Sequence, residues 1–172
     1  MSKHMQRELA HVEKRLIEHC ATVEKSVALA TQALEERRGD LAHDVIAGDT
    51  QIDLEEVAIE EECLKILALH QPVATDLRFV VAALKINNDL ERIGDLAANI
   101  AKRAISVSSE PVLPDFFDFG LMARKTMAML RDGVDSLVRM DMELARRVCE
   151  VDDEVDSMNS KVFELVQAQI QA

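Results

Sequence analysis

The sequence contains few of the residues that interrupt helices or form the turns of strand-rich folds. Its 172 residues include five glycines, three prolines and five phenylalanines, with neither tryptophan nor tyrosine. Folds built from many short strands need frequent turns, and those turns use glycine and proline. Because 48% of the residues are apolar and so few are aromatic, the core must be aliphatic. The composition therefore predicts an all-α protein of long helices.

Further absences exclude several classes of function. No apolar run reaches the ~18 residues of a membrane span, and the charged N-terminal segment lacks a signal-peptide core, so we expect a cytoplasmic protein. The net charge is −12, which makes a nucleic-acid partner unexpected because such binding depends on neutralising phosphates. The motifs GxxxxGK, GxGxxG and GxSxG are absent, and no catalytic constellation is visible, so we expect no enzymatic activity. Cys20, Cys63 and Cys149 form no CxxC pair and are expected to be buried thiols.

Apolar residues recur at heptad spacing in five segments, which predicts five helices. Gly39 is expected to end the first helix, Asp40 to cap the second, and Pro72 to lie in the first turn of the third. The stretch 106–114, rich in serine and proline, is the one credible linker. The expected helices cover residues 4–37, 41–69, 72–107, 115–139 and 142–170.

The second half of the chain repeats the first at a constant shift without gaps. Under that shift the apolar residues Val27, Leu34 and Val45 fall on Leu130, Leu137 and Val148. Each amphipathic helix must bury its apolar face on others, so tandem three-helix bundles follow. We expect a first repeat at 1–107, a linker at 108–114, and a second repeat at 115–172 that lacks its third helix in this chain. The incompletely covered apolar faces of its two helices predict a homodimer or a higher oligomer.

The third helix has one apolar face and one polar face. Glu91, Asp95 and Asn99 follow each other at i, i+4 and so form a ridge of oxygen ligands. Paired carboxylates on a helix are common on solvated surfaces, and Arg92 can pair with Asp89. Alternatively, the ridge binds a hard or borderline metal ion, with further ligands from solvent, a neighbouring helix or a second subunit. The residues expected to face the core are Leu90, Ile93, Ala97, Ile100, Ala101 and Ala104.

Other charged residues have simpler interpretations. Asp76 lies in the first turn of the third helix, where the helix dipole favours a carboxylate. Arg78 is a candidate for an interhelical pair with Glu56 or Glu60. Asp49 and Asp53 are interpreted as part of a solvated face. Glu8 and His11 stand three residues apart near the N-terminus, a spacing we interpret as chance, and the histidines form no set of pairs that indicates a ferritin-like di-iron site.

Three segments resemble the first repeat of the PhoU family of phosphate-signalling proteins: GDTQIDLEEVAIEEECLKIL, QPVATDLRFV and LERIGDLAANIA. The resemblance implies an all-helical protein of two three-helix repeats. It also implies a negative regulator of the phosphate regulon, not an enzyme, that links the ATPase of the phosphate ABC transporter to the sensor histidine kinase. The family motif E-x-x-x-D, at which some members hold iron or zinc clusters, is matched by Glu91 and Asp95. The motif of the second repeat would fall beyond Ala172.

Two other classes of function compete with this adaptor. The first is a metal-storing or metal-dependent oxidoreductase bundle; a ferritin-like site would require ExxH pairs on two helices, and the sequence does not supply them. The second is a purely structural coiled-coil dimeriser. The internal repeat and the linker count against it, because a simple coiled coil needs neither.

Overall fold

The structure, a computed structural model, describes residues 3–111 and 117–171. This part of the chain forms five helices and no strand, which confirms the all-α prediction. None of these described helices combines the length and the apolar composition that a membrane span requires. The helices are α1 (Lys3–Glu35), α2 (Gly39–His70), α3 (Ala74–Val107), α4 (Phe119–Arg139) and α5 (Met142–Gln171).

Two turns differ from those predicted. Arg37, with a left-handed φ of 57°, ends the first helix in the place expected for Gly39, and Gly39 instead opens α2. Asp40 does not cap α2, because the helix begins at Gly39 and Arg38 occupies the N-cap position; its carboxylate lies in the first turn and accepts a hydrogen bond from the Arg38 guanidinium. Pro72 precedes α3, which begins two residues later. The exact helix ends therefore depend on backbone conformation as well as on residue type.

The fourth helix also begins later than predicted. Asp118 caps α4, since its Oδ1 accepts a hydrogen bond of 2.6 Å from the backbone N–H of Leu121. Of the residues expected at the start of this helix, 115 and 116 lie outside the described part of the chain. The bounds of α5 agree with the prediction to within one residue.

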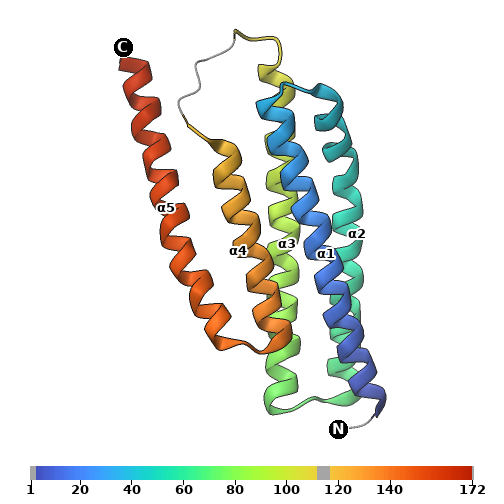
Figure 1. Cartoon of the computed structure of the whole chain (residues 1–172). Coiled ribbons are helices and arrows are strands. Elements are labelled where there is room, and N and C mark those ends of the chain that lie inside the picture. Colours follow the sequence, from blue (N-terminus) through green and yellow to red (C-terminus); the bar gives the residue numbers. More distant parts are fainter. Residues whose placement is uncertain (1–2, 112–116, 172) are drawn as a thin grey trace.

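Helices α1, α2 and α3 pack into a three-helix bundle, and α4 lies mainly against α1 (Figure 1). Val134 of α4 is buried in the core of the bundle, with Leu130 and Leu137 packed against it. The prediction that this face of α4 is poorly covered was therefore wrong, because α1 covers it. Helix α5 contacts only α4 in the described structure, and of its residues only Val155 is buried.

The three cysteines differ in burial according to the helix that carries them. Cys20 and Cys63 are buried as predicted, and burial raises the pKa of their thiols to about 12 and about 11, respectively. Both thiols therefore remain protonated at neutral pH. Cys149 is exposed, contrary to the prediction, because α5 has a single neighbouring helix to cover its side chains.

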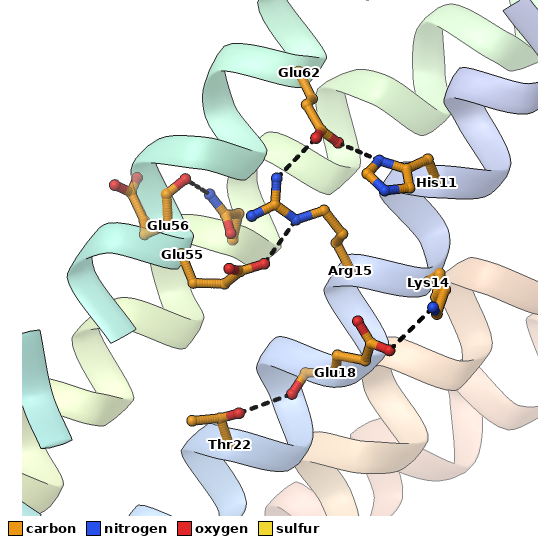
Figure 2. A network of polar contacts seen from close by, with 9 residues as sticks. His11, Lys14, Arg15, Glu18, Thr22, Glu55, Glu56 and Glu62 are labelled. Carbon is orange, nitrogen blue, oxygen red and sulfur yellow. Dashed lines mark hydrogen bonds and ion pairs between the residues drawn. The ribbon is translucent and has the colours of Figure 1, made fainter. Parts of the chain in front are cut away.

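A network of ion pairs joins α1 to α2 around Arg15 (Figure 2). The Arg15 guanidinium donates from Nε to Glu55 Oε1 and from Nη1 to Glu62 Oε1, each at 2.8 Å. His11 Nδ1 lies 2.9 Å from the other oxygen of Glu62. Hydrogen bonds to Glu55 and then to Glu62 raise the pKa of Arg15 above its usual range. The network fixes α1 against α2 and neutralises the acids on this flank of α2.

Candidate functional site

The α2–α3 hairpin brings two acidic segments together. Its helices are antiparallel around Pro72, so residues at similar sequence distances from that proline lie opposite one another. Gly94 shows how closely they approach, because a Cβ built there would lie 2.9 Å from Ile52 Cγ2. Nearer the hairpin turn, Asn87 Nδ2 donates a hydrogen bond of 2.8 Å to the backbone carbonyl of Glu56. Glycine at position 94 therefore permits the close packing on which the site is built.

Helix α3 turns its apolar side toward the bundle, as the sequence predicted. Leu90, Ala97, Ala101 and Ala104 are buried, and Ile93 and Ile100 are half-buried. On the other side, Glu91 is half-buried, whereas Arg92, Asp95 and Asn99 are exposed. The predicted ridge is therefore accessible, with Glu91 at its inner edge.

Across the hairpin, α2 contributes four more acids. We call the combined set the acidic face: Asp49, Asp53, Glu56 and Glu60 of α2 with Glu91 and Asp95 of α3. Burial, followed by repulsion from Asp95 and Asp53, raises the pKa of Glu91. Burial, Asp53 and Asp95 likewise raise the pKa of Asp49. Asp49 and Asp53, interpreted from the sequence as part of a solvated face, therefore lie close enough to the E-x-x-x-D pair of α3 for their charges to repel it.

The charges of the acidic face are not compensated by ion pairs. Within the described residues, none of its six carboxylates has a cationic side chain within 4.0 Å, in contrast to Glu55 and Glu62 on the opposite flank of α2. The positive charge of Lys102 lowers the pKa of Asp49, but this is the smallest of the effects on that carboxyl group. A cation would relieve this repulsion, and carboxylate oxygens suit hard or borderline ions.

The carboxylates of the acidic face do not converge on one point. In the described part of the chain, the one set of three histidine, cysteine or acidic ligand atoms that lie within 4.8 Å of one another is elsewhere, at His4, Glu8 and His70. Binding at the acidic face would thus require side-chain rotation or ligands from solvent. Asn99, one turn beyond Asp95, is exposed.

The other predicted residues have structural positions. Asp76 lies in the first turn of α3, as expected. Arg92 Nη1 lies 3.5 Å from Asp89 Oδ1, which is the predicted local pair. Arg78 is exposed and, among the described residues, pairs with neither Glu56 nor Glu60, so that hypothesis was wrong. The reason is register: Arg78 is close to the hairpin turn, whereas both glutamates lie farther along α2.

Comparison with known proteins identifies the family. The sequence model of the PhoU domain matches residues 16–104 and 119–172. The chain belongs to the PhoU family. The described residues of both matched segments are helical apart from short turns, and the break between the segments contains the predicted linker.

Two relatives illustrate the similarity in sequence. The phosphate-specific transport system accessory protein PhoU homolog of Aquifex aeolicus is 41% identical over 88% of this chain and 69% of that protein. The PhoU accessory protein of Edwardsiella tarda is 36% identical over 87% and 61%, respectively. The chain thus spans roughly two thirds of the length of these PhoU proteins.

Two solved structures show the same similarity in fold. The crystal structure of PhoU from Pseudomonas aeruginosa superposes with a TM-score of 0.89 at 35% identity, covering 96% of this chain and 80% of that one. The phosphate transport system regulatory protein PhoU from Streptococcus pneumoniae gives a TM-score of 0.84 at 25% identity, with the same coverage. The helical arrangement described above is therefore that of the PhoU family.

Proposed function

We propose that this chain is a cytoplasmic helical adaptor that negatively regulates phosphate uptake and the phosphate regulon. Its partners would be the ATPase of the phosphate ABC transporter and the sensor histidine kinase. The observation that carries the proposal is the match to the PhoU domain in both helical segments, together with relatives named as accessory proteins of the phosphate-specific transport system.

The surface of the hairpin supports a role in protein binding. Leu54 and Leu64 of α2 are 60% and 51% exposed, and Leu77 and Val81 of α3 are also exposed. Exposed apolar side chains that lie together on a surface are typical of sites where a partner protein binds and covers them. They lie on the same two helices as the acidic face, so one partner can contact both.

Affinity capture from phosphate-replete cells tests the adaptor. The tagged chain should retain the transporter ATPase or the sensor kinase, identified by mass spectrometry. Leu64→Glu should lower their recovery, whereas the control Ile170→Glu, at an even more exposed position of α5, should not. Recovery of neither partner would contradict the adaptor function, and equal recovery by both variants would exclude Leu64 from the contact.

We further propose that the acidic face binds iron or zinc weakly through oxygen. Glu91 and Asp95 would be the principal ligands, supported by Asp49 and Asp53 from across the hairpin and by Asn99. The support is the uncompensated charge of these residues and the raised pKa of Glu91, whose burial and acidic neighbours disfavour the unbound carboxylate. A bound cation would remove that repulsion.

Titration of metal-free protein with Fe²⁺ or Zn²⁺ tests this site. The variant Glu91→Gln/Asp95→Asn keeps the side-chain shapes and removes two charges, and it should lose binding. Asp152→Asn/Asp156→Asn is the matched control, since it neutralises an exposed i, i+4 pair on α5. If the first variant binds as much metal as the parent, the acidic face is only a solvated surface. Rapid oxidation of Fe²⁺ by the parent would instead favour the oxidoreductase hypothesis.

A further inference from the structure

Three potential metal ligands meet where the start of α1 lies beside the end of α2. His70 Nε2 lies 2.6 Å from Glu8 Oε2, and His4 Nε2 lies 3.4 Å from Glu8 Oε1. The two imidazole rings are in edge contact, with centroids 5.6 Å apart. One ligand atom from each residue lies within 4.8 Å of the other two. The arrangement joins residues distant in the sequence and is separate from the acidic face.

The donor set is that of a transition-metal site. Zinc binds imidazole nitrogen and carboxylate oxygen at about 2.0–2.2 Å, so neighbouring ligands of a tetrahedral ion lie about 3.3 Å apart. The two histidines contact different oxygens of Glu8, and one ligand atom from each of the three residues lies within 4.8 Å of the other two, so small side-chain rotations would bring them to that spacing. We propose that His4, Glu8 and His70 bind a divalent transition-metal ion such as Zn²⁺, with solvent in the remaining position.

The fold holds two of these ligands in place and leaves the third at the entrance. Glu8 and His70 side chains are 18% and 15% exposed, whereas that of His4 is 72% exposed. His70 is the last residue of α2, fixed by the turn at Gln71, whose backbone N–H bonds to the Leu67 carbonyl. His4 and Glu8 are at i, i+4 on α1, the spacing that places two side chains on one helix face. An ion can thus enter from solvent and be closed over by His4.

The charges around Glu8 suit this role but include one competitor. The hydrogen bond from His70, with help from Lys65, lowers the pKa of Glu8, so the carboxylate is ionised at neutral pH as a ligand must be. Lys65 Nζ lies 3.3 Å from Glu8 Oε1, the oxygen that also faces His4. A metal ion would displace this ammonium group. We therefore expect Lys65→Gln to strengthen metal binding.

Zinc titration by calorimetry, in the background of Glu91→Gln/Asp95→Asn, isolates this site from the acidic face. The Glu91→Gln/Asp95→Asn variant, which otherwise has the native sequence, should bind one Zn²⁺ per chain. His70→Gln should weaken that binding by at least about tenfold, since losing a group that merely hydrogen-bonds to a metal ligand already costs that much. The control is His43→Gln, which replaces an exposed histidine elsewhere on α2 and should leave zinc binding as it is in the Glu91→Gln/Asp95→Asn background. Because the background variant lacks Glu91 and Asp95, the principal ligands proposed for the acidic face, its zinc binding tests the His4, Glu8 and His70 site even if the acidic face binds no metal.

A second readout and a second variant separate ligation from folding. Co²⁺ bound to the background protein should give visible absorption typical of a nitrogen-ligated ion, and His4→Gln should abolish it. Because His4 is exposed, this substitution should leave the helical circular dichroism unchanged. If His70→Gln and His4→Gln bind zinc as tightly as the control His43→Gln, the three residues are only an ion-pair cluster and the proposal is overturned.

Discussion

Gly94→Ala tests the close approach of α2 and α3 beneath the acidic face. Two effects of the added methyl group oppose each other. Alanine in the middle of a helix is favoured over glycine by about 1 kcal/mol. The new Cβ, however, would lie 2.9 Å from Ile52 Cγ2 and 3.0 Å from Ile52 Cδ1, too close for either atom to remain in place.

The surroundings of Ile52 decide which effect is larger. Its side chain is 1% exposed and lies in the main core cluster, so it cannot move aside without disturbing its neighbours. Overpacking of this kind costs about 1–3 kcal/mol. We therefore expect Gly94→Ala to lower the free energy of unfolding by about 1 kcal/mol. Gly48→Ala, also inside a helix but with nothing within 4 Å of the new Cβ, should raise it by about the same amount.

Urea unfolding followed by circular dichroism measures both variants and a double-mutant cycle. Ile52→Ala alone should cost about 2–5 kcal/mol. It removes both clashing atoms and keeps the Cβ of residue 52, which would be an ordinary 3.6 Å from the methyl group introduced by Gly94→Ala. In that background Gly94→Ala should become stabilising. If it is as stabilising as Gly48→Ala in the native background, or destabilising in both backgrounds, the packing argument is wrong.

Burial, charge and exposure lead to three other predictions. Leu90→Asp should cost several kcal/mol in urea unfolding because it buries an unpaired charge, whereas Glu91→Ala should cost well under ~1 kcal/mol; similar losses would contradict the facing of α3. The raised pKa of Glu91 means that the folded state binds its proton more readily than the unfolded state. Glu91→Gln should therefore stabilise the protein at pH 7, and its advantage should shrink as the pH falls through that raised pKa; a constant advantage would exclude titration of Glu91 as its cause. Phe163 of α5 is 65% exposed, so light scattering at micromolar concentration should give a mass above 19.2 kDa that Phe163→Ser lowers; a monomeric parent would refute the association.

The sequence predicted those features that depend on local periodicity. The buried and exposed sides of α3 follow from the positions of Leu90 and Glu91 on a regular helix, and five helices follow from the apolar heptads. Helix ends were less accurate because the turns depend on backbone conformations such as the left-handed Arg37, which no residue preference indicated. Coverage of α4 by α1 depends on tertiary packing, which local periodicity does not specify.

The candidate sites were only partly predictable. Asp53 and Glu91 lie at equal distances from Pro72, as do Asp49 and Asp95, so the hairpin register alone could have placed them together. For His70 no such signal exists. It approaches Glu8 because α1 and α2 pack against each other, and the spacing of histidines along one helix cannot reveal a ligand that another helix supplies.

The distribution of charge on α2 connects these sites and separates their chemistry. Toward α1, Glu55 and Glu62 are occupied by Arg15, so these two carboxylates are already paired with a cation. Toward α3, the acids face other acids, and the ligands they offer are oxygens. At the end of α2, His70 adds imidazole nitrogen. Oxygen-only sites favour hard ions such as Mg²⁺ and Mn²⁺, whereas imidazole favours Zn²⁺ and Ni²⁺. Excess Mg²⁺ should therefore compete with zinc at the acidic face and leave zinc bound at His4, Glu8 and His70.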